Sequence, residues 1–183
     1  MFKRDPERFV VLAVTFALVP EGAPTVRYAE LERVLGPAGR DLSTVRDTVL
    51  ALRRAKSMVL DPDDPNRRSA GSFFTNPIVD RERADALVER AVREGLVPTP
   101  DQVPRWPMGP EKTKLAAGWL IERAGIAKGL RRGRVGISSK HALALVHHGG
   151  GTTTELMELA EEVRAAVHAR FAITLTPEPV CWG

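Results

Sequence analysis

One short stretch joins a hydroxyl, two aromatic rings and a carboxamide within a few residues. It reads "GSFFTNP" and begins at Gly71. Glycine permits a tight backbone turn, and Phe73 and Phe74 would exclude water from around the Ser72 hydroxyl. A serine is a poor acid in water, yet it can protonate a strongly basic carbanion or enolate held against it, with Asn76 binding a polar ligand nearby. The alternative, which composition alone favours, is a simple turn followed by two core phenylalanines.

Two charged residues stand at positions that would fix their direction. Glu178 lies between Pro177 and Pro179, and prolines stiffen the backbone on either side of the carboxylate. Lys114 falls at the expected start of a helix, where the helix dipole disfavours a cation. The lysine is therefore expected to have an anionic partner. A surface glutamate and a solvated lysine are the alternatives.

The segment "HHGGG" at residues 147–151 resembles a metal or phosphate motif but lacks the required spacing. On a strand His147 and His148 point to opposite faces, and no third ligand follows at a suitable interval. The glycines have neither dinucleotide-binding nor P-loop spacing, so a flexible entry into a helix is favoured. The segment "GLRRGR" at residues 129–134 is a weak phosphate-binding candidate, for which a solvated turn is the favoured interpretation.

Composition limits the class of protein. The chain has 183 residues, 43% apolar and 27% charged, with a net charge of +4, which suits one folded domain or slightly more. A single cysteine, Cys181, excludes an internal disulfide, and a reducing cytoplasmic setting fits. The longest apolar run, residues 9–20, is too short to cross a membrane. The basic residues are mostly scattered, whereas a nucleic-acid binder more often has a basic stripe interleaved with aromatic residues. Neither a membrane nor a nucleic-acid partner is therefore expected.

The hydrophobic periodicity predicts a mixed α+β fold. Thr152 and Glu155 have the spacing of a capping box at the start of the strongest helix. Strands and helices alternate without regular βαβ units, which favours α+β over α/β. The expected strands cover residues 9–19, 134–138, 142–148 and 172–180, residues 71–79 are extended, and the expected helices cover residues 28–36, 41–58, 81–95, 113–125 and 152–171.

Taken in order, these segments resemble a known family. "RSAGSFFTNPIV", "KLAAGWLIERAG" and the long run from "SSKHALALVHHGGG" to "LTPEPV" are similar to the UDP-N-acetylenolpyruvoylglucosamine reductases, the MurB family. The resemblance covers nearly the whole chain. It implies a small mixed sheet with flanking helices. It also implies a UDP-sugar substrate-binding domain at residues 21–183, preceded at residues 1–20 by a strand left over from an FAD-binding domain.

The resemblance also implies a reaction. In this family NADPH reduces a bound FAD, hydride passes to C3 of the enolpyruvyl group of UDP-N-acetylglucosamine enolpyruvate, and C2 is protonated. The product, UDP-N-acetylmuramate, is a peptidoglycan precursor. The FAD-binding region of the family precedes the residues that match here. We therefore expect the isolated chain to bind no FAD and to be inactive.

Residue by residue, the resemblance assigns roles. Ser72 matches the serine proposed as the acid that protonates C2, and Glu178 matches the glutamate taken to stabilise the enol intermediate. Asn76, Lys56 and Lys114 match residues that bind the anionic substrate, and a diphosphate plus a carboxylate does need such cations.

Further matches are less specific. Tyr28 matches the tyrosine of a loop that folds over the substrate diphosphate in one class of the family. Lys128 and His141 fall at other pocket-lining positions. One departure is Thr75, where the family usually has a lysine, and this removes a positive charge near the expected site.

Two other classes of function remain open from the sequence. One is a non-catalytic UDP-sugar-binding or regulatory module, and the other is a basic nucleic-acid binder, which would show steep salt dependence. Separately, an unpaired apolar strand is an association hazard. Self-association through residues 9–19 is accordingly expected.

Overall fold

The computed structural model describes residues 8–37 and 41–180. Cys181 and the first part of the expected remnant at residues 1–20 lie outside the described residues. The chain divides into two compact units, Met1–Leu50 and Ala51–Gly183. The α+β class expected from the sequence is confirmed, because helices and two small antiparallel sheets share the chain.

The first unit contains helix α1 (Ala29–Leu35) and the beginning of α2 (Leu42–Ala55). Asp41 caps the start of α2. Its carboxylate accepts hydrogen bonds from the backbone N–H of Thr44 at 2.9 Å and from the Thr44 hydroxyl. The first bond satisfies an N–H that the first helical turn leaves without a partner. The hydrogen bond from the Thr44 hydroxyl is the largest cause of a lowered Asp41 pKa.

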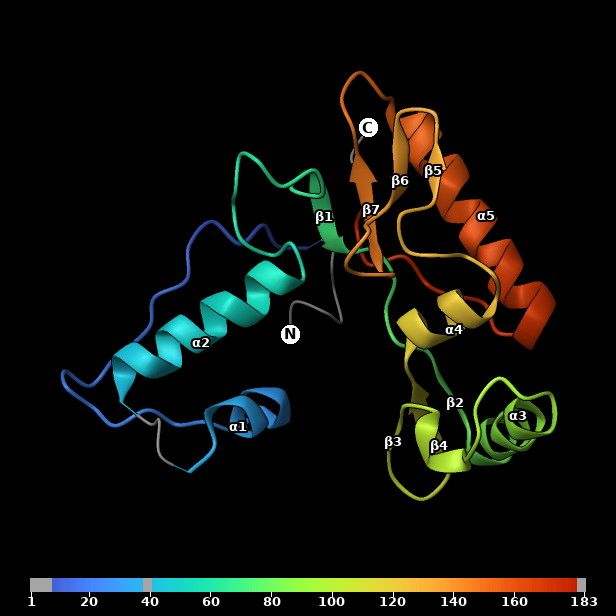
Figure 1. Ribbon diagram of the computed structural model, residues 1–183, viewed down its shortest axis with the longest axis horizontal. Helices are drawn as coiled ribbons and strands as arrows, with labels where there is room; N and C mark the ends of the chain where they lie inside the picture. Colours follow the sequence, from blue (N-terminus) through green and yellow to red (C-terminus); the bar gives the residue numbers. More distant parts are fainter. Residues whose placement is uncertain (1–7, 38–40, 181–183) are drawn as a thin grey trace. The chain divides into compact units, whose positions relative to one another are not determined.

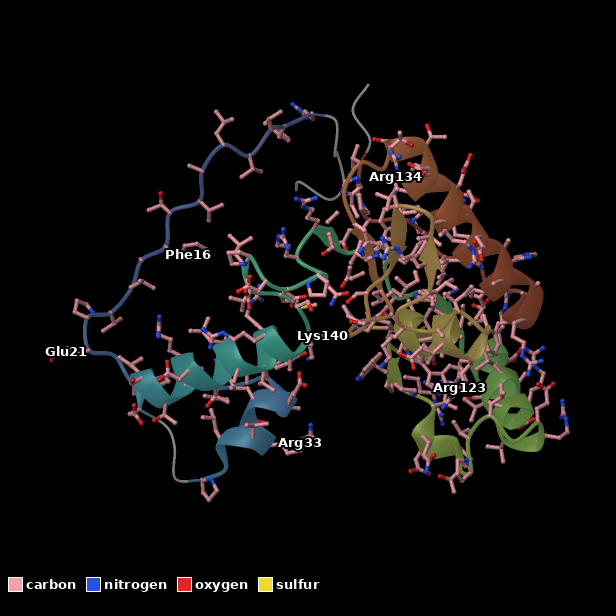
Figure 2. The ribbon with its side chains drawn as sticks, turned by 45° about the horizontal axis from the view of Figure 1, so that its top comes forward. Phe16, Glu21, Arg33, Arg123, Arg134 and Lys140 are labelled. Carbon is pink, nitrogen blue, oxygen red and sulfur yellow. The ribbon has the colours of Figure 1, made fainter. Side chains whose placement is uncertain are left out.

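The strand predicted over residues 9–19 is not formed. The segment is extended but pairs with no other strand among the described residues. Its large side chains face solvent: Leu12 is 91% exposed and Phe16, labelled in Figure 2, is 76% exposed. A β-branched and aromatic composition favours a strand, but a strand is completed only by a partner that takes its backbone hydrogen bonds.

The larger sheet of the second unit has four strands in the order β1–β7–β6–β5 (Figure 1). All neighbours are antiparallel. The bounds are Ser69–Ser72 for β1, Ala144–His147 for β7, Val135–Ile137 for β6 and Arg131–Arg132 for β5. Strands β6 and β7 confirm the strands predicted over residues 134–138 and 142–148.

The pairing of β1 with β7 contains a bulge. Ser69 faces Val146 and Ser72 faces Ala144, so three steps along β1 span two steps along β7. Gly71 takes up the irregularity with φ +80°, a left-handed conformation that costs glycine nothing and strains other residues. The bulge therefore sets the direction of the Ser72 side chain at the end of β1.

The smaller sheet has the order β2–β4–β3. Its strands are Ile78–Asp80 (β2), Lys112–Leu115 (β4) and Arg105–Pro107 (β3), and the 3₁₀ helix η1 (Pro100–Gln102) precedes β3. Helix α3 (Arg81–Arg93) follows β2 directly, and helix α4 (Ala117–Arg123) follows β4.

The position predicted for Lys114 was wrong. It does not start a helix but lies in the middle of β4, paired with Ile78 on one side and Trp106 on the other. The helix begins only at Ala117. Because cross-strand pairing on both sides overrides the local helical pattern, the dipole argument for an anionic partner of Lys114 does not apply.

The strand predicted over residues 172–180 is also wrong, since the segment forms only one isolated antiparallel bridge, between Phe74 and Pro177. It nevertheless packs inward. Ile173 and Leu175 are buried at 3% and 0% exposure, which is the alternation that suggested a strand.

The core lies between the larger sheet and helices α4 and α5 (Thr153–Phe171), which lie on the same side of that sheet in Figure 1. Its largest fully buried side chains are Phe74, Leu115, Leu120, Ile121, Ile137, Leu145, Leu159, Leu175, Val135, Val146, Val163 and Val167. In the part of the chain that the structure describes, no helix has the length and apolar character needed to cross a membrane.

The capping box predicted at Thr152 is confirmed. The Thr152 hydroxyl accepts from the backbone N–H of Glu155 at 3.2 Å, and the Glu155 carboxylate accepts from the backbone N–H of Thr152 at 2.7 Å. Replacing Thr152 with alanine should lower the free energy of unfolding by about 1 kcal/mol, as measured by urea denaturation.

The matched control is Thr154→Ala, two residues further on. This exposed threonine has no side-chain hydrogen bond in the described structure, so its replacement should leave stability unchanged or raise it slightly. Equal losses in the two variants would contradict a specific role for the cap.

Candidate functional site

Ser72 ends β1 with its hydroxyl beside a histidine. The Oγ atom lies 3.4 Å from Nε2 of His141, in the loop before β7, and both side chains are half-buried. The hydrogen bond runs in either direction according to the histidine tautomer. When Nε2–H donates, the serine proton stays free to point elsewhere, and a negative charge developing on Oγ would be stabilised.

The two phenylalanines after Ser72 belong to the core. Phe73 and Phe74 are 4% and 1% exposed, and their rings meet edge to face with centroids 5.1 Å apart. The bland interpretation of these residues is thus correct for their side chains. The same burial fixes the backbone on which Ser72 stands, because removing a buried phenylalanine costs about 3–5 kcal/mol.

Backbone hydrogen bonds bring Glu178 to this segment. The Glu178 N–H donates to the carbonyl of Phe73 at 2.9 Å, and the Thr75 N–H donates to the carbonyl of Thr176 at 3.0 Å. The Glu178 side chain is exposed. Residues about one hundred positions apart in the chain therefore present a hydroxyl and a carboxylate from adjacent backbones.

Asn76 supports the start of α4. Its side-chain Oδ1 accepts a hydrogen bond from the backbone N–H of Ala117 at 2.9 Å. That N–H belongs to the first helical turn and has no partner within the helix. The amide nitrogen of Asn76 retains two N–H donors for a ligand.

Lys114 lies just beyond Asn76, held by strand pairing. The Leu115 N–H donates to the carbonyl of Pro77 at 2.9 Å. The Lys114 ammonium lies 5.4 Å from the centroid of the Trp106 ring, which is 45% exposed. A cation over an aromatic face is attracted by the ring electrons, so Trp106 fixes the position of this ammonium.

These groups follow one stretch of chain. Phe73, beside Glu178, and Ile78, opposite Lys114, are five residues apart, so their Cα atoms are at most about 18 Å apart. Ser72, Glu178, Asn76 and Lys114 thus lie along a span comparable with an extended sugar nucleotide.

Two further lysines surround His141. Burial lowers the pKa of the His141 imidazole, and the charges of Lys56 and Lys128 lower it further, whereas the Glu122 carboxylate raises it. Lys128 is itself ion-paired with Glu122 at 3.2 Å. His141 is therefore held toward its neutral form next to Ser72.

A buried polar network fixes the loop that carries His141. The Asp64 carboxylate accepts from the backbone N–H of Asn66 at 2.8 Å and from the Lys140 ammonium at 3.1 Å, and Lys140 is labelled in Figure 2. The Asn66 side chain in turn accepts from the backbone N–H of Ser139 at 3.0 Å. Burial alone would raise the pKa of Asp64, but these hydrogen bonds hold it well below its ordinary range.

Two residues named from the sequence stand apart from this account. Tyr28 precedes α1 in the first unit and is 64% exposed. Thr75, where the family usually has a lysine, is exposed, and its hydroxyl donates to the carbonyl of Thr176 at 3.3 Å. The threonine thus serves the pairing with the Glu178 segment.

The glycine loop before α5 is contacted by two neighbouring side chains. The N–H groups of Gly149 and Gly151 lie 3.3 and 2.8 Å from Nδ1 and Nε2 of His147, of which a neutral imidazole accepts at one, and the Gly150 carbonyl accepts from the Arg134 guanidinium. The loop is thus occupied by its own neighbours, which does not suit a phosphate cradle.

Sequence reasoning missed two contributors to this region. The Trp106 ring contacts the Lys114 ammonium. In the sequence, Trp106 is marked only by its position in a proline-rich connection, eight residues before Lys114. Asp64 carries the buried network, and nothing in "DPDDPN" distinguishes it from its exposed neighbour Asp63. Both depend on contacts between segments that are distant in the sequence.

The fold and this arrangement agree with one protein class. The sequence model of the family "UDP-N-acetylenolpyruvoylglucosamine reductase, C-terminal domain" matches residues 63–182, and the chain belongs to this family. The resemblance stated from the sequence is therefore confirmed.

Individual relatives carry the same name. The UDP-N-acetylenolpyruvoylglucosamine reductases of Thermobifida fusca and Saccharopolyspora erythraea are 51% and 50% identical to this chain. Each alignment covers 97% of this chain and 50% of the relative's length. The reductase of Mycobacterium tuberculosis is 45% identical over 95% of the chain and 48% of the relative. The chain spans about half the length of the curated relatives it matches.

The surroundings of His141 generate a prediction. Replacing Lys56 with glutamine should raise the His141 pKa toward its ordinary value of about 6.5, because one of the two cations that disfavour imidazolium is removed. An NMR pH titration of the imidazole C2–H signal measures this shift. Because the folded state binds fewer protons than the unfolded chain below that value, stability should rise with pH in this window, and less so in the variant.

Lys112→Gln is the matched control, because Lys112 is paired with Asp80 at 2.6 Å and does not influence His141. An unchanged His141 pKa in the Lys56 variant would show that the two groups are not neighbours.

Proposed function

We propose that this chain carries the substrate-binding and proton-donating part of a UDP-N-acetylmuramate dehydrogenase. That enzyme reduces the enolpyruvyl group of UDP-N-acetylglucosamine enolpyruvate with NADPH in peptidoglycan biosynthesis. The observation that supports this most is the Ser72 hydroxyl, 3.4 Å from a histidine held neutral, on a backbone that also binds the Glu178 segment.

Ser72 would supply the proton to C2 of the substrate. Protonation of C2 together with hydride addition to C3 saturates the double bond and leaves no other group to depart. The serine becomes an alkoxide as it gives up its proton, and Nε2–H of His141 would stabilise that charge by a charge-assisted hydrogen bond. Since proton transfer requires a group within hydrogen-bond reach of the reacting atom, Ser72 is the acid and His141 a positioning residue.

The remaining groups suit an anionic substrate. Lys56 and Lys114 would bind its phosphates and carboxylate, and the free amide N–H groups of Asn76 would donate to its polar atoms. Glu178 would lie near the reacting carbons and orient the enol intermediate. Preorganised charges of this kind act most strongly where charge develops during the reaction.

FAD, reduced by NADPH, supplies the hydride in this proposal. We assign its main binding site to the flavin-binding region of the family, because the family model that matches residues 63–182 is that of the C-terminal domain. We further propose that residues 21–183 form the UDP-sugar domain, that residues 1–20 belong to a flavin-binding domain, and that Tyr28 covers the substrate diphosphate. A cytoplasmic location fits soluble nucleotide substrates.

Isothermal titration with UDP-N-acetylglucosamine enolpyruvate tests the binding half of this proposal. Lys114→Gln should weaken binding about tenfold or more, because a hydrogen bond to a charged group is lost. Ser72→Ala should bind almost as well as the original chain. With the amino-terminal half of a relative supplied, the same Ser72 variant should lose most of its NADPH oxidation.

Lys112→Gln serves again as the control, because it lies in the same strand and already has the Asp80 carboxylate as its partner. Equal weakening in both lysine variants would contradict a specific role for Lys114. Binding without any Ser72-dependent turnover would favour the second candidate, a non-catalytic UDP-sugar-binding module.

We also propose that residues 9–19 mediate self-association with a second copy of the chain. The supporting observation is the run of exposed apolar side chains on a segment that belongs to neither sheet of the described residues. Light scattering over a concentration series should show a larger mass for the chain than for a version that begins after Pro20. A double variant, Leu12→Ser and Phe16→Ser, should reproduce the smaller mass.

Leu60→Ser is the control, because Leu60 is 94% exposed but lies outside the segment. An identical mass for the chain and the shortened version would remove this proposal without affecting the reductase assignment.

A further inference from the structure

A basic cavity lies at the opposite end of the β1–β7 pair from Ser72. Its volume is about 210 Å³, and no carboxylate is among its lining residues, which are Pro65, Arg67, Arg68, Arg131, His147 and His148. We call it the Arg68–Arg131 pocket. The proposed function uses none of these residues.

The strand order of the larger sheet gathers the lining residues. The His147 N–H donates to the carbonyl of Arg68 at 2.9 Å, which fixes the residue before β1 beside the end of β7. Gly136 pairs with Arg131 in β5, and a Cβ atom built at Gly136 would lie 3.1 Å from Nε2 of His148. The ring of His148 therefore lies over a glycine whose neighbour across the sheet is Arg131.

The positive charge in the pocket is not neutralised. Among the described residues no ion pair involves Arg67, Arg68 or Arg131, whereas the next residue, Arg132, pairs with Glu162. Arg67 and Arg131 donate only to backbone carbonyls, at 3.3 and 3.2 Å.

The excess positive charge acts on His148. Burial lowers the pKa of His148, and the charges of Arg131 and His147 lower it further. No acidic group acts in the opposite direction on it. An anion entering the pocket would relieve this repulsion.

The absence of a side chain at Gly149 leaves room for the guanidinium of Arg68. Gly149 has φ +103°, and a Cβ atom built there would lie 3.3 Å from Nη1 of Arg68. Arg134, labelled in Figure 2, holds the next glycine through its carbonyl. The loop is thus fixed close to Arg68 while the guanidinium keeps its N–H groups available.

We propose that the Arg68–Arg131 pocket binds a phosphoryl or diphosphate group of a small soluble ligand. Guanidinium groups bind such oxyanions through paired, charge-assisted hydrogen bonds, and the cavity suits a small group. A nucleic acid would need a basic stripe extending over the surface. Ser72 and Arg68 are four residues apart along β1, about 13 Å, so the pocket is separate from the proposed proton donor.

The four histidines of the chain allow a local test. Sodium diphosphate is titrated into the chain while NMR follows the imidazole signals, assigned by single His→Gln variants. The His147 and His148 signals should shift saturably, and those of His168, exposed near the end of α5, should not. Arg68→Gln and Arg131→Gln should each weaken the binding about tenfold or more.

Arg93→Gln is the matched control, since Arg93 is an exposed arginine of α3 that lines a different, also arginine-rich cavity. It should leave the His147 and His148 titration unchanged, as should Lys114→Gln. Equal weakening by Arg93→Gln would overturn the proposal in favour of general charge attraction, and so would the absence of saturation.

A titration with a short DNA duplex tests whether the pocket binds a nucleic acid instead of a small ligand. If DNA shifts these signals at lower concentration than diphosphate does, a nucleic acid replaces the small ligand and the proposal is wrong. The His141 signal reports the proposed substrate site separately, so the failure of either proposal can be recognised without the other.

Discussion

The candidate site depends on one backbone pairing, between residues 73–75 and residues 176–178. Two hydrogen bonds, from Glu178 to Phe73 and from Thr75 to Thr176, join segments that are about a hundred positions apart. The pairing is held in place by Phe73 and Phe74, which are buried in the core. Without it the serine and the glutamate would belong to separate parts of the surface.

This arrangement explains why the core and the site are inseparable here. The two rings that stabilise the second unit are the direct neighbours of Ser72, so the packing energy of the core also orients the hydroxyl. On the other side Asn76 bonds the first turn of α4, and α4 packs against α5. Ser72, Asn76 and Lys114 are thus each one or two residues from a buried apolar side chain, which keeps a site of a small domain rigid.

Local signals in the sequence were enough for the helices and for some strands. The capping box at Thr152 and the apolar stripe after it predict α5 correctly, because both act within a few turns. Lys114 was misplaced because its strand is defined by two partners, β2 and β3, that the local pattern does not reveal. The prediction for residues 9–19 was wrong for the opposite reason, because their composition favours a strand but no strand of the described residues pairs with them.

The site residues follow the same division. Ser72 and Asn76 could be singled out because they share one short motif, and Glu178 because prolines flank it. Lys114 was singled out by a wrong helix start, and the other assignments came from the resemblance. The proximity of His141 to Ser72, the Trp106 contact and the Asp64 network could not be predicted, because each joins segments that only the fold brings together. The buried Asp64 illustrates the difficulty, since Asp63 beside it is exposed.

The bulge in β1 makes the spacing of this strand as important as its composition. Three steps along β1 correspond to two along β7, and in a regular strand residues three apart point to opposite faces. Loss of one residue between Ser69 and Ser72 would restore a regular ladder while leaving every side chain of the site in the sequence. Ser69 and Ser72 would still share a face, as their partners Val146 and Ala144 do, but the bulge that directs the Ser72 hydroxyl would be lost.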